Sequence, residues 1–199
     1  MRLVARPSFS AIQIPNHLLT LIEDHDSNPD LPFSHSEAEI IERRAEAYQA
    51  AAKYCAYQDR CTREVLRKLE KFTLTEEDVS EVLKRLREEQ WLDDERFARS
   101  FARGKFRIKV WGRIKIKQEL LARGIDRSLA EDALTELNEE EYRSALNAKI
   151  RRHATTVRAS DAYDLKVRLT RWANGRGYEN WITRGTIEDI AKGRFEPLS

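Results

Sequence analysis

The sequence predicts an all-α protein: three tandem three-helix repeats that form an elongated helical stack, with an irregular N-terminal arm. Its 199 residues include five prolines, and none of them lies between Pro32 and Pro197. A long stretch without proline favours helices, because proline removes a backbone donor and clashes with the preceding turn. The same stretch is rich in Ala, Leu, Glu, Lys and Arg, which have high helix propensity, and its apolar residues recur at helical spacing.

Capping residues mark where several of these helices begin. Ser36 with Glu39, and Asn138 with Glu141, have the spacing of a capping box. Single N-cap residues precede three further apolar-periodic runs, at Thr75, Asp93 and Asp126. Together these signals predict roughly nine helices of modest length.

One segment has the alternation of a strand. On both sides of Gly112, in residues 107–117, polar and apolar residues alternate, which is typical of a half-buried strand. Because Ile116, Leu120 and Leu121 continue at helical spacing toward Gly124, we predict a helix for the second part of this segment.

An internal repeat of about 50 residues sets the number of modules. Gly124-Ile125 corresponds to Gly177-Tyr178 after a shift of 53 residues. Shifts of 51 and then 53 residues also align three sets of mostly large apolar residues: Val65, Leu69, Leu83 and Leu86; Ile116, Leu120, Leu134 and Leu137; and Leu169, Ala173, Ile187 and Ile190. Each copy would contain helix, helix, short turn and helix, and would bury an apolar face on its neighbour. The alternative is a chance match within a leucine-rich helical protein.

The repeat divides the chain into an arm and three modules. We assign residues 1–36 to the arm, 37–91 to the first repeat, 92–137 to the second and 138–192 to the third. The arm holds four of the five prolines, which favours irregular structure. Within it, residues 17–22 either dock on the body as a short helix or strand, or are disordered with the rest.

The second repeat carries a run of basic residues. Residues 96–117 contain no acid and these nine cations: Arg96, Arg99, Arg103, Lys105, Arg107, Lys109, Arg113, Lys115 and Lys117. Charges of one sign at this density repel one another unless an anionic partner compensates. Interleaved aromatic residues anchor the segment in a core, so we expect a fixed patch that binds a nucleic-acid backbone or an acidic protein groove. The alternative is a solvated face whose charges are neutralised by acids from another helix.

A second, less pure basic region is predicted in the third repeat. Its candidate contact residues are Arg151, Arg152, Arg171 and Arg176. The chain's net charge is nevertheless only +2, because acidic residues are concentrated elsewhere, mostly near predicted helix starts, where they stabilise the helix dipole. This mixed-sign surface favours a monomer.

No catalytic or metal-binding pattern stands out in the sequence. None of the four histidines has metal-ligand spacing, and nucleotide-binding glycine motifs and a nucleophile elbow are absent. Cys55 and Cys61 match no zinc or redox motif, so we expect reduced thiols. We therefore expect a protein that is not an enzyme and needs no cofactor or metal. It has no apolar run long enough for a membrane span and no secretory signal pattern, and we expect it in the cytoplasm.

The basic repeat resembles a known family. Trp91-Leu92-Asp93-Asp94-Glu95-Arg96-Phe97-Ala98, and then Gly112 to Ile125 with its Glu119-Leu120 and Arg123-Gly124-Ile125, are similar to the signature of RecX, the bacterial regulator of RecA recombinase. Arg60 to Val65 and Arg176-Gly177-Tyr178 resemble the corresponding elements of the family's first and last repeats. The resemblance covers roughly residues 45–190. Phe72 departs from it, standing where glycine is common, and so does Glu179 at an expected N-cap.

The resemblance implies a fold of three tandem three-helix repeats and a role in DNA repair, homologous recombination and the SOS response. It implies a protein that binds RecA filaments on single- or double-stranded DNA, meeting the DNA directly or through the filament. This protein would modulate, mostly inhibit, ATP hydrolysis, strand exchange and co-protease activity. The matched positions Arg96, Arg99, Arg103, Arg113 and Lys117 would be the foremost contacts. Two other classes stay open: a general basic nucleic-acid-binding protein, and a helical enzyme or scaffold.

Overall fold

The computed structural model describes residues 35–195, and the arm predicted for residues 1–36 lies almost wholly outside the described residues. Within the described range the chain forms nine α-helices and one short 3-10 helix, without strands, which confirms the predicted all-α class. None of these helices is both long and apolar enough to cross a lipid bilayer. The chain divides into two compact units, one ending at Phe97 and the other beginning at Ala98.

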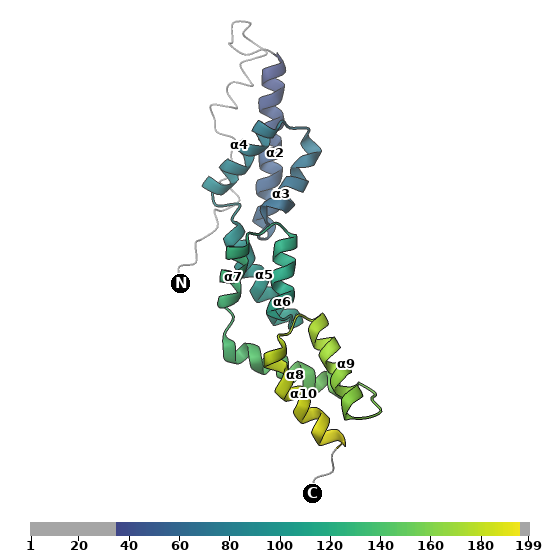
Figure 1. The fold of residues 1–199 in the computed structure, drawn as a ribbon. Helices are drawn as coiled ribbons and strands as arrows, with labels where there is room; N and C mark the ends of the chain where they lie inside the picture. The colour runs from purple at the N-terminus through teal and green to yellow at the C-terminus, as the bar shows by residue number, and fades with distance from the viewer. Residues whose placement is uncertain (1–34, 196–199) are drawn as a thin grey trace. The chain divides into compact units, whose positions relative to one another are not determined.

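The first unit is built around helix α2 (His35–Tyr57), which packs against α3, η2 and α4 (Figure 1). Ala47 and Ala51 of α2 are fully buried, and such small side chains allow neighbouring helices to approach closely. The remaining helices of this unit are α3 (Thr62–Leu69), η2 (Glu70–Phe72) and α4 (Glu76–Glu88). They close the core with Val65, Leu69, Val82, Leu83 and Leu86.

The second unit contains most of α5 (Asp94–Lys109) and all later helices. In it, α6 packs against α7, while α10 packs against both α8 and α9 (Figure 1). Its core includes the fully buried Ile116, Leu146 and Leu169. The helices that follow α5 are α6 (Arg113–Ala122), α7 (Arg127–Thr135), α8 (Glu139–Ala154), α9 (Ala162–Gly175) and α10 (Asn180–Phe195).

Four of the predicted N-caps are present. The side chains of Thr75, Asp126 and Asn138 accept hydrogen bonds from backbone N–H groups of the first helical turn, and Asp93 Oδ1 accepts one from the Arg96 N–H at 2.9 Å. The predicted cap at Ser36 is wrong, because α2 already begins at His35 and Ser36 lies inside the helix.

The segment with strand-like alternation is helical on both sides of a break. Helix α5 ends at Lys109, Val110 has a positive φ of 49°, and α6 begins at Arg113. The predicted helix over the second part of the segment is therefore confirmed. The alternating residues belong to the end of one helix and the start of the next, which meet at a sharp turn.

Positions that correspond in the internal repeat have corresponding environments. Of the twelve aligned apolar residues, eleven are buried and Ile190 is half-buried. Gly124 and Gly177 both have positive φ, 78° and 75°, and each ends a helix with the same pair of hydrogen bonds. The glycine N–H donates to the carbonyl of Leu121 or Asn174 at 2.9 Å, and the next residue's N–H donates to the carbonyl of Leu120 or Ala173 at 3.1 Å. This is the Schellman ending, which favours glycine. The repeat boundaries themselves stay a prediction.

Thr73, one residue after the position expected for glycine at Phe72, takes the glycine position in the first repeat. It lies 51 residues before Gly124, follows the short helix η2, and has φ 49° and ψ 51°. A β-branched residue in this left-handed conformation is strained by about 1–2 kcal/mol. The first repeat thus keeps the left-handed turn without a glycine, and the backbone of Thr73 bears the strain.

We expect Thr73→Gly to stabilise the first unit. The variant removes the left-handed strain and loses part of that gain to the greater freedom of glycine in the unfolded chain, which leaves a net increase of about 0.5–1 kcal/mol in the free energy of unfolding. Urea unfolding followed by circular dichroism measures it. Gly124→Ala, at an equivalent backbone conformation, should lower the free energy of unfolding by about 1 kcal/mol. A destabilised Thr73→Gly variant would contradict the assignment of strain.

Candidate functional site

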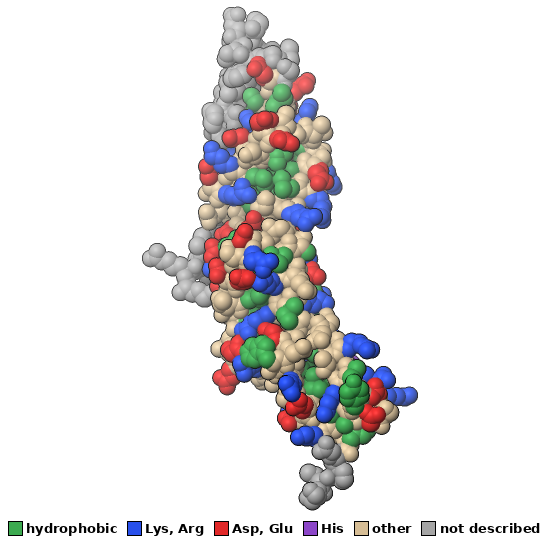
Figure 2. Space-filling view, in the orientation of Figure 1, with side chains coloured by type: hydrophobic (Ala, Val, Ile, Leu, Met, Phe, Trp, Pro, Cys, Tyr) green, Lys and Arg blue, Asp and Glu red, His purple; other side chains and the backbone are tan. Residues whose placement is uncertain are grey.

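The structure divides the nine basic residues of 96–117 into two groups. Five of them form ion pairs with carboxylates: Arg96, Arg99, Arg103, Arg113 and Lys117. These are the residues expected to be the foremost partner contacts. On the face shown in Figure 2, basic and acidic side chains are accordingly intermingled. For these five, neutralisation by acids from elsewhere in the chain is what the structure shows, and their contact with a partner stays a prediction.

Three arginines of α5 are ion-paired with carboxylates that lie outside α5. Arg96 Nε lies 3.0 Å from Asp59 Oδ1 in the first unit. Arg99 and Arg103 lie one turn apart on α5, and each is 2.9 Å from the carboxylate of Glu136 in the second unit. A single carboxylate thus neutralises two guanidinium groups, and it fixes the end of α7 to α5.

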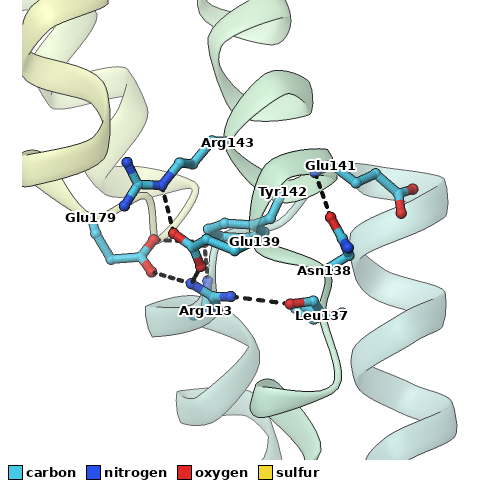
Figure 3. A network of polar contacts seen from close by, with 8 residues as sticks. All are labelled: Arg113, Leu137, Asn138, Glu139, Glu141, Tyr142, Arg143 and Glu179. Atoms are coloured by element: carbon cyan, nitrogen blue, oxygen red, sulfur yellow. Dashed lines mark hydrogen bonds and ion pairs between the residues drawn. The ribbon is translucent and has the colours of Figure 1, made fainter.

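Arg113 lies at the centre of a polar network (Figure 3). Its guanidinium is 2.8 Å from Glu139, donates to the Leu137 carbonyl at 3.3 Å, and lies 4.2 Å from the centroid of the Tyr142 ring. The Tyr142 hydroxyl accepts from the Arg113 backbone N–H at 2.8 Å and donates to Glu179 at 2.6 Å. Burial, and then this bond to Glu179, raise the pKa of Tyr142. The network therefore joins α6 to α8 and to the start of α10.

Lys117 has a simpler, more exposed partner. Its Nζ lies 2.6 Å from Glu131 Oε1 on α7. This hydrogen bond lowers the pKa of the Glu131 carboxyl. The pair is exposed, and pairs of this kind add little to stability.

Three of the other four basic residues surround Trp111. The Nζ atoms of Lys105, Lys109 and Lys115 lie 5.2, 5.5 and 4.7 Å from the centroid of the Trp111 ring. We call Trp111 and these three residues the lysine–tryptophan cluster. Within residues 35–195, none of the three lysines is within ion-pairing distance of a carboxylate, and neither is the exposed Arg107.

The cluster follows from the break between α5 and α6. Lys105 and Lys109 lie one turn apart on α5, which ends at Lys109, while Lys115 lies in the first turn of α6. The reversal at Val110 brings both helix ends around the intervening Trp111. Cations favour the faces of an indole ring. The break between the two helices thus brings three lysines of the basic run to one aromatic residue.

A glycine pair fixes this turn in the second unit. Gly112 N donates to Arg176 O at 2.9 Å and Ile114 N to Gly177 O at 3.2 Å. The start of α6 therefore satisfies carbonyls at the end of α9, where its positive end meets a negative end. A Cβ on Gly112 would lie 1.9 Å from Gly177 O, and one on Gly177 2.3 Å from Lys115 N. No larger residue fits at either position without moving the backbone.

The third-repeat basic region is only partly brought to the same place. Arg176 lies 4.5 Å from the centroid of the Trp172 ring, on which His153 stacks at 4.1 Å. Tyr178 meets the Trp172 ring edge-on at 5.9 Å and donates to Val110 O at 2.8 Å, and burial raises the pKa of Tyr178 to about 12. Arg176 is thus linked through Tyr178 to the turn that carries Trp111. Three other candidates are simply exposed: Arg151, Arg152 and Arg171.

Trp111 is one of the interleaved aromatic residues that the sequence predicted to anchor the basic run in a core. Its place at the centre of the three lysines was not predicted. An aromatic residue flanked on both sides by alternating lysines was the available signal. The described part of the chain contains no group of three or more His, Cys, Asp or Glu residues that could hold a metal ion. Cys55 and Cys61 are both buried and form no disulfide, and burial raises the pKa of Cys61.

These features define a helical-repeat protein with a basic, aromatic-centred surface. Two family models match the chain: the first three-helix domain of RecX at residues 47–86 and the second at residues 93–134. The regulatory protein RecX of Prosthecochloris aestuarii is 30% identical over 147 residues, which cover 72% of this chain and 93% of that protein. The chain therefore belongs to the RecX family of regulatory proteins.

Other relatives and solved structures agree with this assignment. RecX of Oceanobacillus iheyensis is 34% identical over 104 residues, and RecX of Halalkalibacterium halodurans 29% over 143. The matched parts cover 52% and 72% of this chain but only 38% and 54% of those longer proteins. A crystal structure of regulatory protein RecX gives a TM-score of 0.73 at 22% identity over 88% of both chains. RecX from Lactobacillus salivarius gives 0.68 at 23%, over 75% of this chain and 97% of that one. At such identities the likeness shows the fold.

We expect Gly112→Ala to destabilise the second unit by about 3 kcal/mol or more, because the added methyl group meets backbone atoms that cannot move independently. Denaturant unfolding measures this. Gly104→Ala is the matched control: it lies inside α5 with no atom within 4 Å of the added Cβ, and it should gain about 0.5–1 kcal/mol. Equal stability of the two variants would contradict the close backbone contact.

His153 should titrate below its usual range. Burial and then the positive charge of Arg176 lower its pKa from 6.5. A lowered histidine pKa means that the unfolded chain binds more protons, so the stability contributed by neutral His153 is lost as the pH falls below about 6.5. NMR titration of the imidazole measures the pKa. Arg176→Gln should raise it toward 6.5, and a wild-type value at or above 6.5 would overturn the assignment.

Proposed function

We propose that this chain binds RecA recombinase filaments on DNA and modulates them, mostly by inhibiting ATP hydrolysis, strand exchange and co-protease activity. The observation that carries the proposal is the lysine–tryptophan cluster on a member of a regulatory family. Three cations gather there without a carboxylate among the described residues. The resemblance of the second repeat to RecX supports RecA as the partner.

The two groups of basic residues have different roles in this proposal. An ion-paired arginine such as Arg113 or Arg103 already has its charge compensated, and using it for a partner would break contacts between helices. The three lysines of the cluster pair with no described carboxylate, so using them for a partner breaks no ion pair. Binding them to phosphates releases counterions from the nucleic acid, which drives association at ordinary salt concentrations.

Regulation without catalysis has a direct physical form. A protein that binds one state of a filament more tightly than another shifts the equilibrium between them by that difference in affinity. We therefore propose a monomeric cytoplasmic regulator without a cofactor, whose effect depends on occupancy of the filament. A general nucleic-acid-binding protein is the second candidate, and the same cluster favours it because its cations would also fit bare DNA.

The test is a titration of the chain into RecA on single-stranded DNA with ATP hydrolysis as the measurement. We expect inhibition by the wild type. We expect weaker inhibition by the triple variant Lys105→Gln, Lys109→Gln, Lys115→Gln, with a midpoint shifted to concentrations at least tenfold higher, about 1.4 kcal/mol of binding free energy.

The matched control removes three exposed lysines of the first unit, in the variant Lys53→Gln, Lys71→Gln, Lys84→Gln. It loses the same net charge, so it should shift the midpoint far less than the cluster variant. No effect of wild type on ATP hydrolysis, with DNA binding retained, would reject filament regulation in favour of the second candidate. Equal shifts by the two triple variants would reject the cluster as the contact.

A further inference from the structure

We infer that the lysine–tryptophan cluster is a subsite for a single-stranded polynucleotide: an unpaired base stacks on Trp111, while the three lysines bind the phosphates on either side of it. The inference rests on the proposed function for its setting, a protein acting where single-stranded DNA is bound. It goes beyond that proposal in stating that this chain contacts the DNA strand itself, and through which residues.

The first step concerns charge. The three ammonium groups lie between 4.7 and 5.5 Å from one ring centroid, so they are close enough to repel one another. Arginines elsewhere in the basic run are compensated by carboxylates, as Arg103 is by Glu136 at 2.9 Å. In the described residues the cluster has only aromatic rings and the Gly175 carbonyl, 3.4 Å from Lys115 Nζ. A phosphate backbone supplies the missing negative charge.

The second step concerns the ring. A duplex hides the faces of its bases, so an aromatic residue at the centre of a cationic surface adds to binding only when bases are unpaired. Trp111 is half-buried rather than sealed in the core. Its lysines sit on long flexible stems, so they can leave the indole face for phosphates when a base replaces them.

The third step concerns rigidity. The backbone on both sides of Trp111 is held: Val110 O accepts from the Tyr178 hydroxyl at 2.8 Å, and Gly112 N donates to Arg176 O at 2.9 Å. The backbone N–H of Trp111 donates to Lys105 O at 3.3 Å. A platform fixed in this way loses little conformational freedom when a base stacks on it.

The first measurement is intrinsic fluorescence of the full chain with an oligo-dT strand of about 20 nucleotides, long enough to span a typical single-strand site. Wild type should be quenched on binding. Trp111→Phe should lose most of the quenching and bind about tenfold more weakly, because phenylalanine offers a smaller stacking surface. Trp181→Phe is the matched control, since Trp181 is 64% exposed and also carries a cation, Arg143, at 4.8 Å. It should retain both quenching and affinity.

The second measurement is the salt dependence of binding, by anisotropy of a labelled oligo-dT. Each lost phosphate contact should reduce the log–log slope by about 0.7 for a single strand, so the Lys105, Lys109 and Lys115 triple variant should lose about 2. The triple variant at Lys53, Lys71 and Lys84 should keep the wild-type slope. Circular dichroism confirms that each variant remains helical.

The outcomes separate this inference from the proposed function. Quenching retained in Trp111→Phe, equal slopes for the two lysine triples, or binding of a duplex of the same length as tightly as the single strand would each overturn the subsite. Loss of oligo-dT binding in the cluster variants alongside absent RecA inhibition by wild type would leave the subsite standing and reject filament regulation. Inhibition by wild type without any oligo-dT binding would do the reverse.

Discussion

The contact between Gly112 and Gly177 is the constraint on which the candidate surface depends. Two helix ends meet there backbone to backbone, and α6 can begin only where the carbonyls of Arg176 and Gly177 accept its first N–H groups. The left-handed turn at Gly177, φ 75°, presents those carbonyls. Trp111 directly precedes Gly112 in the chain. The contact between Gly112 and Gly177 therefore fixes where Trp111 lies in the second unit, without the help of a binding partner.

The positions of the carboxylates determine which cations of the second unit are neutralised. Glu136, Glu139 and Glu131 follow or belong to helices that pack near α5 and α6, and each takes one or more cations of the basic run. No described carboxylate reaches the turn at Trp111, where backbone carbonyls and aromatic rings are the neighbours. A formal net charge of +2 is thus compatible with one local site of uncompensated positive charge.

Periodicity and capping were sufficient to predict the helices, because N-caps such as Asn138 and stops such as Gly124 act within a few residues of chain. Ion pairing was not predictable, because Arg99 and Glu136, or Lys117 and Glu131, meet only after α7 folds back. The family resemblance ranked Arg96, Arg99, Arg103, Arg113 and Lys117 as the foremost contacts, and nothing local in the sequence indicated that these five are ion-paired. Ser36 failed as a cap since helix α2 starts one residue earlier.

The two uses of cations on aromatic rings show how one interaction serves both stability and binding. The Arg113 guanidinium on Tyr142 is also bonded to Glu139 and to Leu137 O, so its position is overdetermined and its loss would loosen the joint of three helices. Among the described residues, the lysines on Trp111 contact only aromatic rings and, for Lys115, the Gly175 carbonyl. An ammonium on a flexible stem gains only about 0.5–1 kcal/mol from an exposed ring. A phosphate offers more. The weakness of these contacts is therefore what makes the lysines available to a ligand, while the strength of the neighbouring network keeps the ring in place.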